Sequence, residues 1–408
     1  MGDIVVGIDI GSSKVCTTIG RVNRADALEI LGEGMDLCNG VKKGVIVDID
    51  STSRSIRASI EQAESMANLR IGSAYFNISG AHAAVISKRS SVSVAGENRE
   101  IDAEDVDRVL YNARSIPIPQ DRQLIDVIPR QYIIDGYDEI IDPIGMVGVK
   151  LEVDADIVVG KITSVQNIVK SAEKANIKVD GLVVETMATS EMVLTSDEKD
   201  MGVVMIDVGG STTDVSAYKN RRLVHYDSLP VGGDHITNDI SIGLKISHAD
   251  AERIKRQYEL ALTSLIKNDQ EILVNELNEN KKKSLKVSEL VEIIEARVYE
   301  IFLLCHKNLT ASLGAVSACN AGVVLTGGGI SYVDGGRQLA GEIFEMPVRV
   351  APLKFPGLTK PECVTASGIV KYVSGNFKGR GCGSEVRSHR QDTKRKTGFF
   401  RSIYKKLF

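Results

Sequence analysis

Two segments of the 408-residue chain share a pattern that strongly limits the possible fold. The first is Ile8-Asp9-Ile10-Gly11-Ser12-Ser13, and the second, 198 residues later, is Ile206-Asp207-Val208-Gly209-Gly210-Ser211. In each, an apolar run carries an aspartate near its end, a turn of small residues follows, and another apolar run begins. One such hairpin is a weak signal, but two copies predict two related domains that face a cleft.

The small residues after each aspartate predict a phosphate-binding loop. Glycine and serine let successive backbone N–H groups point into one concavity, which suits phosphate oxygens. Asp9 and Asp207 are expected beside the same phosphates, where carboxylates and water can hold Mg²⁺. A third glycine-rich turn, Gly327-Gly328-Gly329, follows a short apolar strand predicted at 323–325. The three turns together predict a nucleotide site.

This order of motifs resembles the superfamily of actin, heat-shock chaperones and sugar kinases, and within it the FtsA family of bacterial cell-division proteins. The resemblance covers nearly the whole chain, including a strand-helix-strand-strand block at 82–159, Gly-Gly-Asp at 232–234 and the C-terminal tail. It implies an α/β, actin-like two-domain ATPase fold. In that fold duplicated mixed sheets surround a nucleotide cleft, and a small α+β subdomain is inserted.

The resemblance and the composition divide the chain into two halves, an insert and a tail. Glycine, serine and arginine dominate the stretch before the last residues, which predicts a disordered linker there. The expected segments are 1–81, 160–200 and about 350–373 for the first half, 82–159 for the insert, 201–246 and 312–349 for the second-half core, 247–311 for a helical second-half subdomain, 374–397 for the linker and 398–408 for an amphipathic membrane helix.

Carried over onto matching positions, the resemblance implies a site for ATP and Mg²⁺. Both phosphate loops contact the β- and γ-phosphates, and the triple glycine lets the adenine approach the backbone. Two charged residues lie on a helix where the superfamily contacts adenosine, although they can equally be solvated charges. The expected nucleotide-binding residues are Gly11, Ser12, Ser13, Lys14, Gly209, Gly210, Ser211, Thr212, Glu252, Lys255, Gly327, Gly328 and Gly329, with Asp9 and Asp207 holding Mg²⁺ through water.

Glu185 is the candidate catalytic residue. It follows the apolar strand 182–184, at the position where polymerising bacterial actins place a water-activating acid. A general base there must reach the attacking water. Charged residues at strand ends are often only solvated caps, and members of this family hydrolyse ATP slowly or barely. The resemblance therefore implies at most a weak ATPase and leaves enzymatic activity open.

Charge is strongly segregated along the chain. Residues 377–408 carry a net charge of +8 and the first 376 carry −12, so the overall value of −4 is an average. That average argues against a nucleic-acid partner. The last eleven residues predict a helix about 16 Å long, with one apolar and one basic face, that lies in the interface of anionic lipid or docks on the protein's own core. The residues expected at the membrane are Phe399, Phe400, Arg401, Ile403, Tyr404, Lys405, Lys406, Leu407 and Phe408.

Several other classes of protein are excluded by the sequence. No apolar run reaches the ~18 residues that a membrane-spanning helix needs. No basic region precedes the first apolar run, so a secretory signal is not expected. The six cysteines include no C-x-x-C pair, a pattern typical of reduced thiols in a cytosolic protein.

The resemblance also implies partners and a location. Members of the family polymerise at the cytoplasmic face of the membrane at the division site, and they tether the tubulin-like FtsZ ring by binding the FtsZ C-terminal tail. Arg297, in the 247–311 subdomain, matches a family position there, although it can equally be a solvated neighbour of Glu300. Two alternatives share the phosphate loops: a small-molecule (sugar-type) kinase and an actin-like ATPase of pilus assembly.

Overall fold

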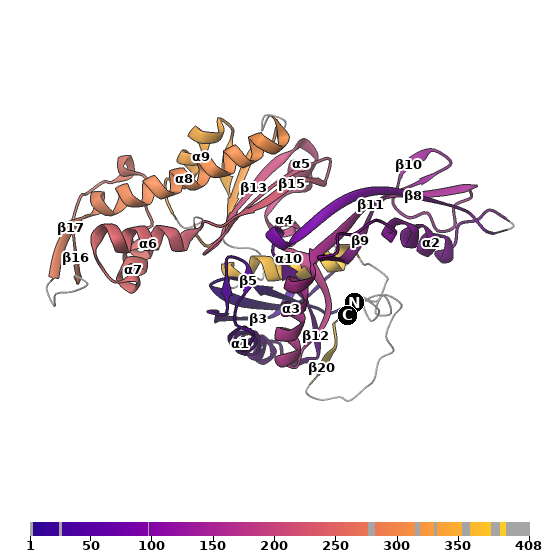
Figure 1. Ribbon diagram of the computed structural model, residues 1–408, viewed down its shortest axis with the longest axis horizontal. Helices are drawn as coiled ribbons and strands as arrows, with labels where there is room; N and C mark the ends of the chain where they lie inside the picture. The colour runs from indigo at the N-terminus through magenta and orange to yellow at the C-terminus, as the bar shows by residue number, and fades with distance from the viewer. Residues whose placement is uncertain are drawn as a thin grey trace.

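Two five-stranded sheets form the cores of the two halves, and a four-stranded sheet forms the insert (Figure 1). The computed structural model describes residues 3–388 apart from 24–26, 97, 276–281, 315–318, 330–332, 353–359 and 377–383. The strand order β3-β2-β1-β7-β12 of the first sheet is matched by β15-β14-β13-β18-β19 in the second. In both sheets three antiparallel strands are followed by two parallel ones. This duplication confirms the predicted actin-like fold with mixed sheets.

The first half contains strands from the N-terminal part of the chain and a helix that returns to it from the C-terminal part. Its strands are β1 (Val5–Ile10), β2 (Lys14–Val22), β3 (Leu28–Leu37), β4 (Val41–Lys42), β5 (Val45–Ile46), β6 (Leu69–Ile71), β7 (Ser73–Ile78) and β12 (Lys178–Val184), and its helices are α1 (Ile49–Ala67), α3 (Ile162–Lys174), α4 (Glu185–Val193), η4 (Pro361–Cys363) and α10 (Val364–Asn376).

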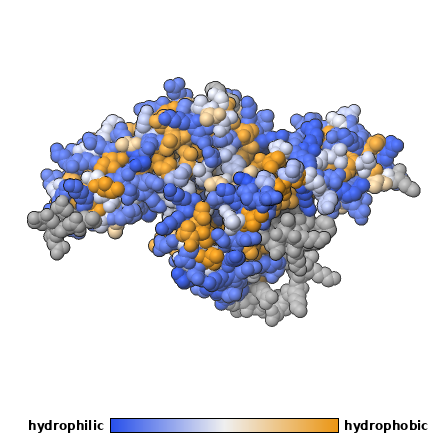
Figure 2. Space-filling view, in the orientation of Figure 1, coloured by the Kyte–Doolittle hydropathy of each residue, from blue (hydrophilic) through white to orange (hydrophobic). Residues whose placement is uncertain are grey.

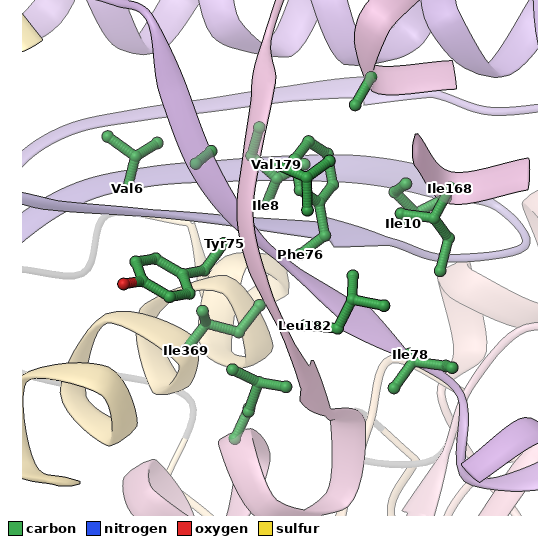
Figure 3. Packing of buried hydrophobic residues seen from close by; sticks show 14 of the residues in the cluster. Val6, Ile8, Ile10, Tyr75, Phe76, Ile78, Ile168, Val179, Leu182 and Ile369 are labelled. Atoms are coloured by element: carbon green, nitrogen blue, oxygen red, sulfur yellow. The ribbon is translucent and has the colours of Figure 1, made fainter. Parts of the chain in front are cut away.

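The first sheet is packed between helices on its two faces. Because side chains alternate along a strand, successive residues of β2 meet different helices. Thr17 Oγ1 lies 2.8 Å from Ser59 Oγ of α1, and Thr18 Oγ1 lies 3.1 Å from Ser367 Oγ of α10. Figure 3 shows Ile369 of α10 beside Tyr75 of β7 in this buried cluster. Packing from both faces fixes the end of β1, where Asp9 lies.

The insert leaves the first half between β7 and α3. Its elements are η1 (Gly80–His82), β8 (Ala83–Ser93), α2 (Ala103–Arg114), β9 (Arg122–Ile134), β10 (Tyr137–Ile140) and β11 (Lys150–Lys161). The sheet has the order β10-β9-β11-β8, and α2 packs on it to form a separate hydrophobic core. Asp102 caps α2 in a reciprocal capping box with Asp105. Figure 1 shows the insert extending away from the helical part of the second half.

The second half combines its sheet with a helical subdomain. Its strands are β13 (Val203–Val208), β14 (Thr213–Lys219), β15 (Arg222–Leu229), β16 (Glu271–Asn275), β17 (Lys282–Lys286), β18 (Val323–Thr326) and β19 (Val348–Val350), and its helices are α5 (Ser196–Met201), α6 (Gly233–Leu244), α7 (His248–Tyr258), η2 (Thr263–Leu265), α8 (Val287–Leu313) and α9 (Gly336–Phe344).

The disordered linker predicted at 374–397 is wrong for the residues of that stretch that the structure describes. Residues 374–376 complete α10, and β20 (Val386–Ser388) pairs antiparallel with β6. The preceding residue joins the same edge, since Gly72 N donates to Glu385 O, and Val386 packs against the first-half core. Composition predicted disorder, but an unpaired strand edge binds another chain segment through backbone groups, which every sequence has.

The face of the molecule shown in Figure 2 is mostly hydrophilic. On the face shown in Figure 2, hydrophobic residues form separate patches among hydrophilic ones. Among the helices of the described residues, none combines the length and the hydropathy that crossing a membrane requires.

Candidate functional site

The two phosphate loops have the same backbone geometry and face each other. Gly11 N donates to Lys14 O at 2.9 Å in the first loop, and Gly209 N donates to Thr212 O at 2.9 Å in the second. The loops approach so closely that a Cβ atom on Gly210 would lie 2.1 Å from Ser13 Oγ. The structure therefore brings the predicted residues of both loops together, although 198 residues separate them in the chain.

The triple glycine follows β18 and runs along the second phosphate loop. Gly327 has a φ of 95°, and a Cβ there would lie 2.3 Å from Asp207 Oδ1. Gly329 N donates to Val208 O at 2.8 Å, and a Cβ on Gly329 would lie 2.7 Å from Gly209 O. Glycine is required at these positions because two backbones touch with no space for a side chain.

The predicted adenosine residues Glu252 and Lys255 lie on α7 and point at the first turn of α6. Lys255 Nζ donates to Thr237 Oγ1 at 2.7 Å and to Gly233 O at 3.1 Å, and it lies 2.6 Å from Glu252 Oε2. A Cβ on Gly233 would lie 3.1 Å from Gly329 Cα, so this group adjoins the triple glycine. Burial raises the pKa of Glu252, but hydrogen bonds from Lys255, Thr237 and Arg256 outweigh it and lower the pKa to about 2. Both residues therefore pair with each other within the second half, beside the triple glycine.

Carboxyl groups gather where the two loops meet: Asp9 and Asp214 are buried, and Asp207 is half-buried. Burial raises the pKa of Asp9 to about 7 and that of Asp207 to about 6, and Lys14 opposes both shifts. Burial, followed by the charge of Asp207 among other causes, raises the pKa of Asp214 to about 7. A cluster of this kind disfavours more negative charge unless a cation joins it.

Asp214 belongs to this cluster, and the sequence analysis did not include it among the site residues. It faces Asp207 directly across the β13–β14 pair. The signal was available, because a hairpin with the four-residue loop 209–212 puts position 214 opposite position 207. Register, rather than motif similarity, identifies this residue.

Two orphaned oxygens test whether the cluster suits a cation. Asp9 Oδ1 and Asp214 Oδ1 are buried and have no hydrogen-bond partner among the described residues. Such an atom needs a proton, a water molecule or a cation. Within the described part of the chain, no group of three or more His, Cys, Asp or Glu side chains is arranged to hold a metal directly. A site with only a few carboxylates and several water molecules matches the coordination that Mg²⁺ prefers.

Glu185 lies at the edge of the same cluster. It is the first residue of α4, directly after β12. Burial, and then the charges of Asp214, Asp9 and Asp207, raise its pKa well above the ordinary value. The structure thus brings Glu185 to the phosphate loops, and its catalytic role stays a prediction.

Arg297 lies on α8, in the helical subdomain, and is paired. Its Nε donates to Asp239 of α6 and its Nη1 to Glu300 one turn along α8. Its side chain is 27% exposed. The predicted membrane residues 399–408 lie outside the described residues.

Comparisons with known proteins identify the family. The family model "Cell division protein FtsA" matches residues 204–368, and "SHS2 domain inserted in FTSA" matches residues 80–159. The chain is 37% identical to cell division protein FtsA of Pseudomonas aeruginosa over 91% of this chain and 89% of that protein. The chain belongs to the FtsA family. FtsA of Bacillus subtilis is 36% identical over 93% of this chain and 85% of that protein, and FtsA of Escherichia coli is 32% identical over 90% of each.

Solved structures agree with the fold of an FtsA-family protein. The PilM-PilN type IV pilus biogenesis complex gives a TM-score of 0.56 at 15% identity, covering 90% of this chain and 97% of that chain. MreB5 of Spiroplasma citri bound to ADP gives 0.56 at 12% identity, covering 92% and 99%. At these identities the likeness supports the actin-like fold alone. The match of the insert to the SHS2 domain agrees with the compact α+β unit of β8–β11 and α2.

Proposed function

We propose that this FtsA-family chain is an ATP-binding, actin-like adaptor that polymerises on the membrane and tethers the FtsZ ring through a C-terminal amphipathic helix. The observation that carries ATP binding is the convergence of three glycine turns, from both halves of the molecule, on one group of carboxylates and Lys14. Glycine turns supply backbone N–H groups to phosphates, and Lys14 supplies the positive charge. The solved MreB5 structures bound to ADP and to AMPPNP support this proposal by analogy of fold.

Mg²⁺ completes the charge balance of the proposed site. Asp9 and Asp207, with the orphaned oxygen of Asp214 nearby, would hold it largely through water. When bound, the ion neutralises the β- and γ-phosphates. The chain's own residues then orient the nucleotide, with the phosphate loops at one end and α7 with the triple glycine at the other. Glu185 would accept a proton from the attacking water, and the expected turnover is slow.

The membrane and partner proposals rest on the sequence and on family membership. The basic residues 377–408 and the apolar face of 398–408 suit an anionic lipid surface at the cytoplasmic side of the membrane. One short amphipathic helix binds weakly, so a filament that presents many copies binds through effective concentration. The FtsZ tail is proposed to bind the helical subdomain near Arg297. The family match favours this function over a small-molecule kinase or a pilus-assembly ATPase.

Vesicle recruitment tests this function directly. Purified full-length chain is mixed with vesicles containing phosphatidylglycerol and with FtsZ, with and without Mg-ATP, and sedimented beside a variant that lacks 398–408. Both proteins should bind ATP in calorimetry, and only the full chain should carry FtsZ to the vesicles. Vesicle binding by the deletion variant would refute the membrane helix, and absence of ATP binding in both proteins would refute the nucleotide site.

A further inference from the structure

A small hairpin of the first half touches both phosphate loops. Strands β4 and β5 pair as Val41↔Ile46 and Lys42↔Val45, which leaves Lys43-Gly44 as a two-residue turn. Lys43 has a φ of 50° and Gly44 a φ of 73°, as the two central residues of a type I′ turn require. This tight turn lies against the loops that are expected to hold phosphate.

Two backbone N–H groups of the turn donate hydrogen bonds to serine side chains, one in each half of the molecule. Gly44 N donates to Ser12 Oγ of the first phosphate loop at 3.3 Å. Lys43 N donates to Ser211 Oγ of the second loop at 3.2 Å, across 168 residues of sequence. Both serines are half-buried. The turn is therefore a bridge between the two loops on the side of the site where these serines lie.

The direction of these hydrogen bonds determines which further hydrogen bonds the two serines can make. A backbone N–H can only donate, so each serine oxygen must accept. A hydroxyl that accepts one bond still has its own proton to donate, and an anionic oxygen is the strongest acceptor for it. The hairpin thus leaves the hydroxyl protons of Ser12 and Ser211 available to an anion between the loops.

The position of the hairpin indicates which phosphate this is. The triple glycine touches the second loop at Gly209, because a Cβ on Gly329 would lie 2.7 Å from Gly209 O. The hairpin touches the same loop two residues further on, at Ser211. A nucleotide whose adenosine lies beside the triple glycine therefore has its terminal phosphate next to Ser211 and Ser12.

We propose that the Lys43-Gly44 turn positions Ser12 and Ser211 as donors to the γ-phosphate of ATP and so makes the site prefer ATP to ADP. This inference rests on the proposed ATP binding and adds the element that distinguishes the two nucleotides. Lys43 and Gly44 are positioning residues, because they act through the serines and use backbone groups. The exposed Lys43 side chain is not required.

The test compares the affinities for Mg-ATP and Mg-ADP, measured by calorimetry on the full chain. Gly44→Val forces a β-branched residue into a left-handed turn, where a Cβ added at Gly44 would lie 3.0 Å from Ser79 Oγ. We expect this variant to lose about tenfold in ATP affinity and less than about twofold in ADP affinity, because charge-assisted hydrogen bonds are lost only with ATP. Gly136→Val is the matched control, since Gly136 also has a positive φ of 93° in a hairpin turn and nothing lies within 4 Å of its Cβ position. It should leave both affinities unchanged.

Two further variants assign the effect. Lys43→Asn keeps the N–H and tolerates the left-handed conformation while removing the charge, so its ATP affinity should stay within about threefold of the natural chain. A Ser12→Ala/Ser211→Ala chain should lose the ATP preference, and adding Gly44→Val to it should change nothing more. If Gly44→Val fails to fold, the Ser12→Ala/Ser211→Ala chain remains as the test, and an unchanged ATP preference in that chain would overturn the inference.

Equal loss of ATP and ADP affinity, additivity with the serine changes, or a tenfold loss in Lys43→Asn would each overturn the inference. A natural chain that binds neither nucleotide would instead refute the proposed function.

Discussion

The two duplicated hairpins have the same strand register but differ in the charged side chains that they carry. In the first, Asp9 faces Cys16 across the β1–β2 pair, and in the second, Asp207 faces Asp214 across β13–β14. The residue whose backbone oxygen accepts the hydrogen bond that closes the loop is Lys14 in the first half and Thr212 in the second. The first hairpin thus supplies an aspartate and a cation, whereas the second supplies two carboxylates.

This difference shows how a duplicated unit becomes specialised without any change of backbone. The identical loop bond fixes where each side chain points, so one substitution at a given register position changes the chemistry of the cleft. In the proposed site the first half would supply the cation that attracts phosphate, and the second half would supply the negative charge that Mg²⁺ offsets.

The largest difference is expected between Lys14→Met and Thr212→Val. Lys14 is the cation placed against Asp9 and Asp207, and its loss removes charge-assisted contact with phosphate. ATP affinity should fall about a hundredfold, in keeping with the ~1.5–3 kcal/mol of a hydrogen bond to a charged group, and Thr212→Val should lose less than about tenfold. Calorimetry with Mg-ATP measures both. Similar losses in the two variants would mean that the loops share the phosphates equally.

The paired aspartates should respond alike to removal of the metal. Asp9→Asn and Asp207→Asn should each weaken ATP binding in Mg²⁺ by about 10- to 100-fold, the range for residues that orient metal-bound groups. In EDTA the two variants should bind ATP at least as tightly as the natural chain, since no metal is present to orient and each variant carries one negative charge fewer. A variant that is as weak in EDTA as in Mg²⁺ would show that its aspartate supports the loop rather than the ion.

The next comparison is between Asp214 and Cys16, which hold equivalent positions in the two hairpins. Substitution should raise the free energy of unfolding at Asp214 and lower it at Cys16. Asp214→Asn removes one charge from the carboxylate cluster, so the nucleotide-free protein should gain on the order of 1 kcal/mol in free energy of unfolding at pH 8. Cys16 is fully buried, so Cys16→Ser should lose about 1–3 kcal/mol in free energy of unfolding because it buries a hydroxyl. Urea unfolding without Mg²⁺ measures both changes. A loss of stability in Asp214→Asn would mean that its charge is already compensated.

The weakest response is expected from Glu252→Gln, which removes the ion pair of Glu252 with Lys255 on α7. The folded-state pKa of Glu252 is about 2, below its ordinary value of 4.5. The folded protein therefore binds fewer protons than the unfolded chain between these values, and the stability from Glu252 is present above pH 4.5 and lost towards pH 2. The natural chain should exceed the variant by less than about 1 kcal/mol at pH 6, because the pair is half-exposed. A difference that persists unchanged to pH 3 would contradict this titration.

The fold class and the family could be predicted from the sequence, and so could the residues of the two loops and the triple glycine that the structure brings together. Asp9, Asp207 and the triple glycine were recognisable because each sits in a short motif whose conformation depends on its immediate neighbours. Repetition of one motif revealed the duplication of the sheets. The limits of the inserted unit were also visible, since its strands and its capped helix have their own hydrophobic pattern.

Which distant groups meet depends on the tertiary structure. Arg297 has its partner because α6 offers Asp239, and residues 384–388 have their place because the edge of β6 is unpaired. The hydrogen bond from Lys43 to Ser211 joins residues 168 positions apart, and no local pattern marks either one as a partner. Short motifs fix local backbone shape, whereas contacts across the cleft depend on how the halves pack, and that is a property of the whole chain.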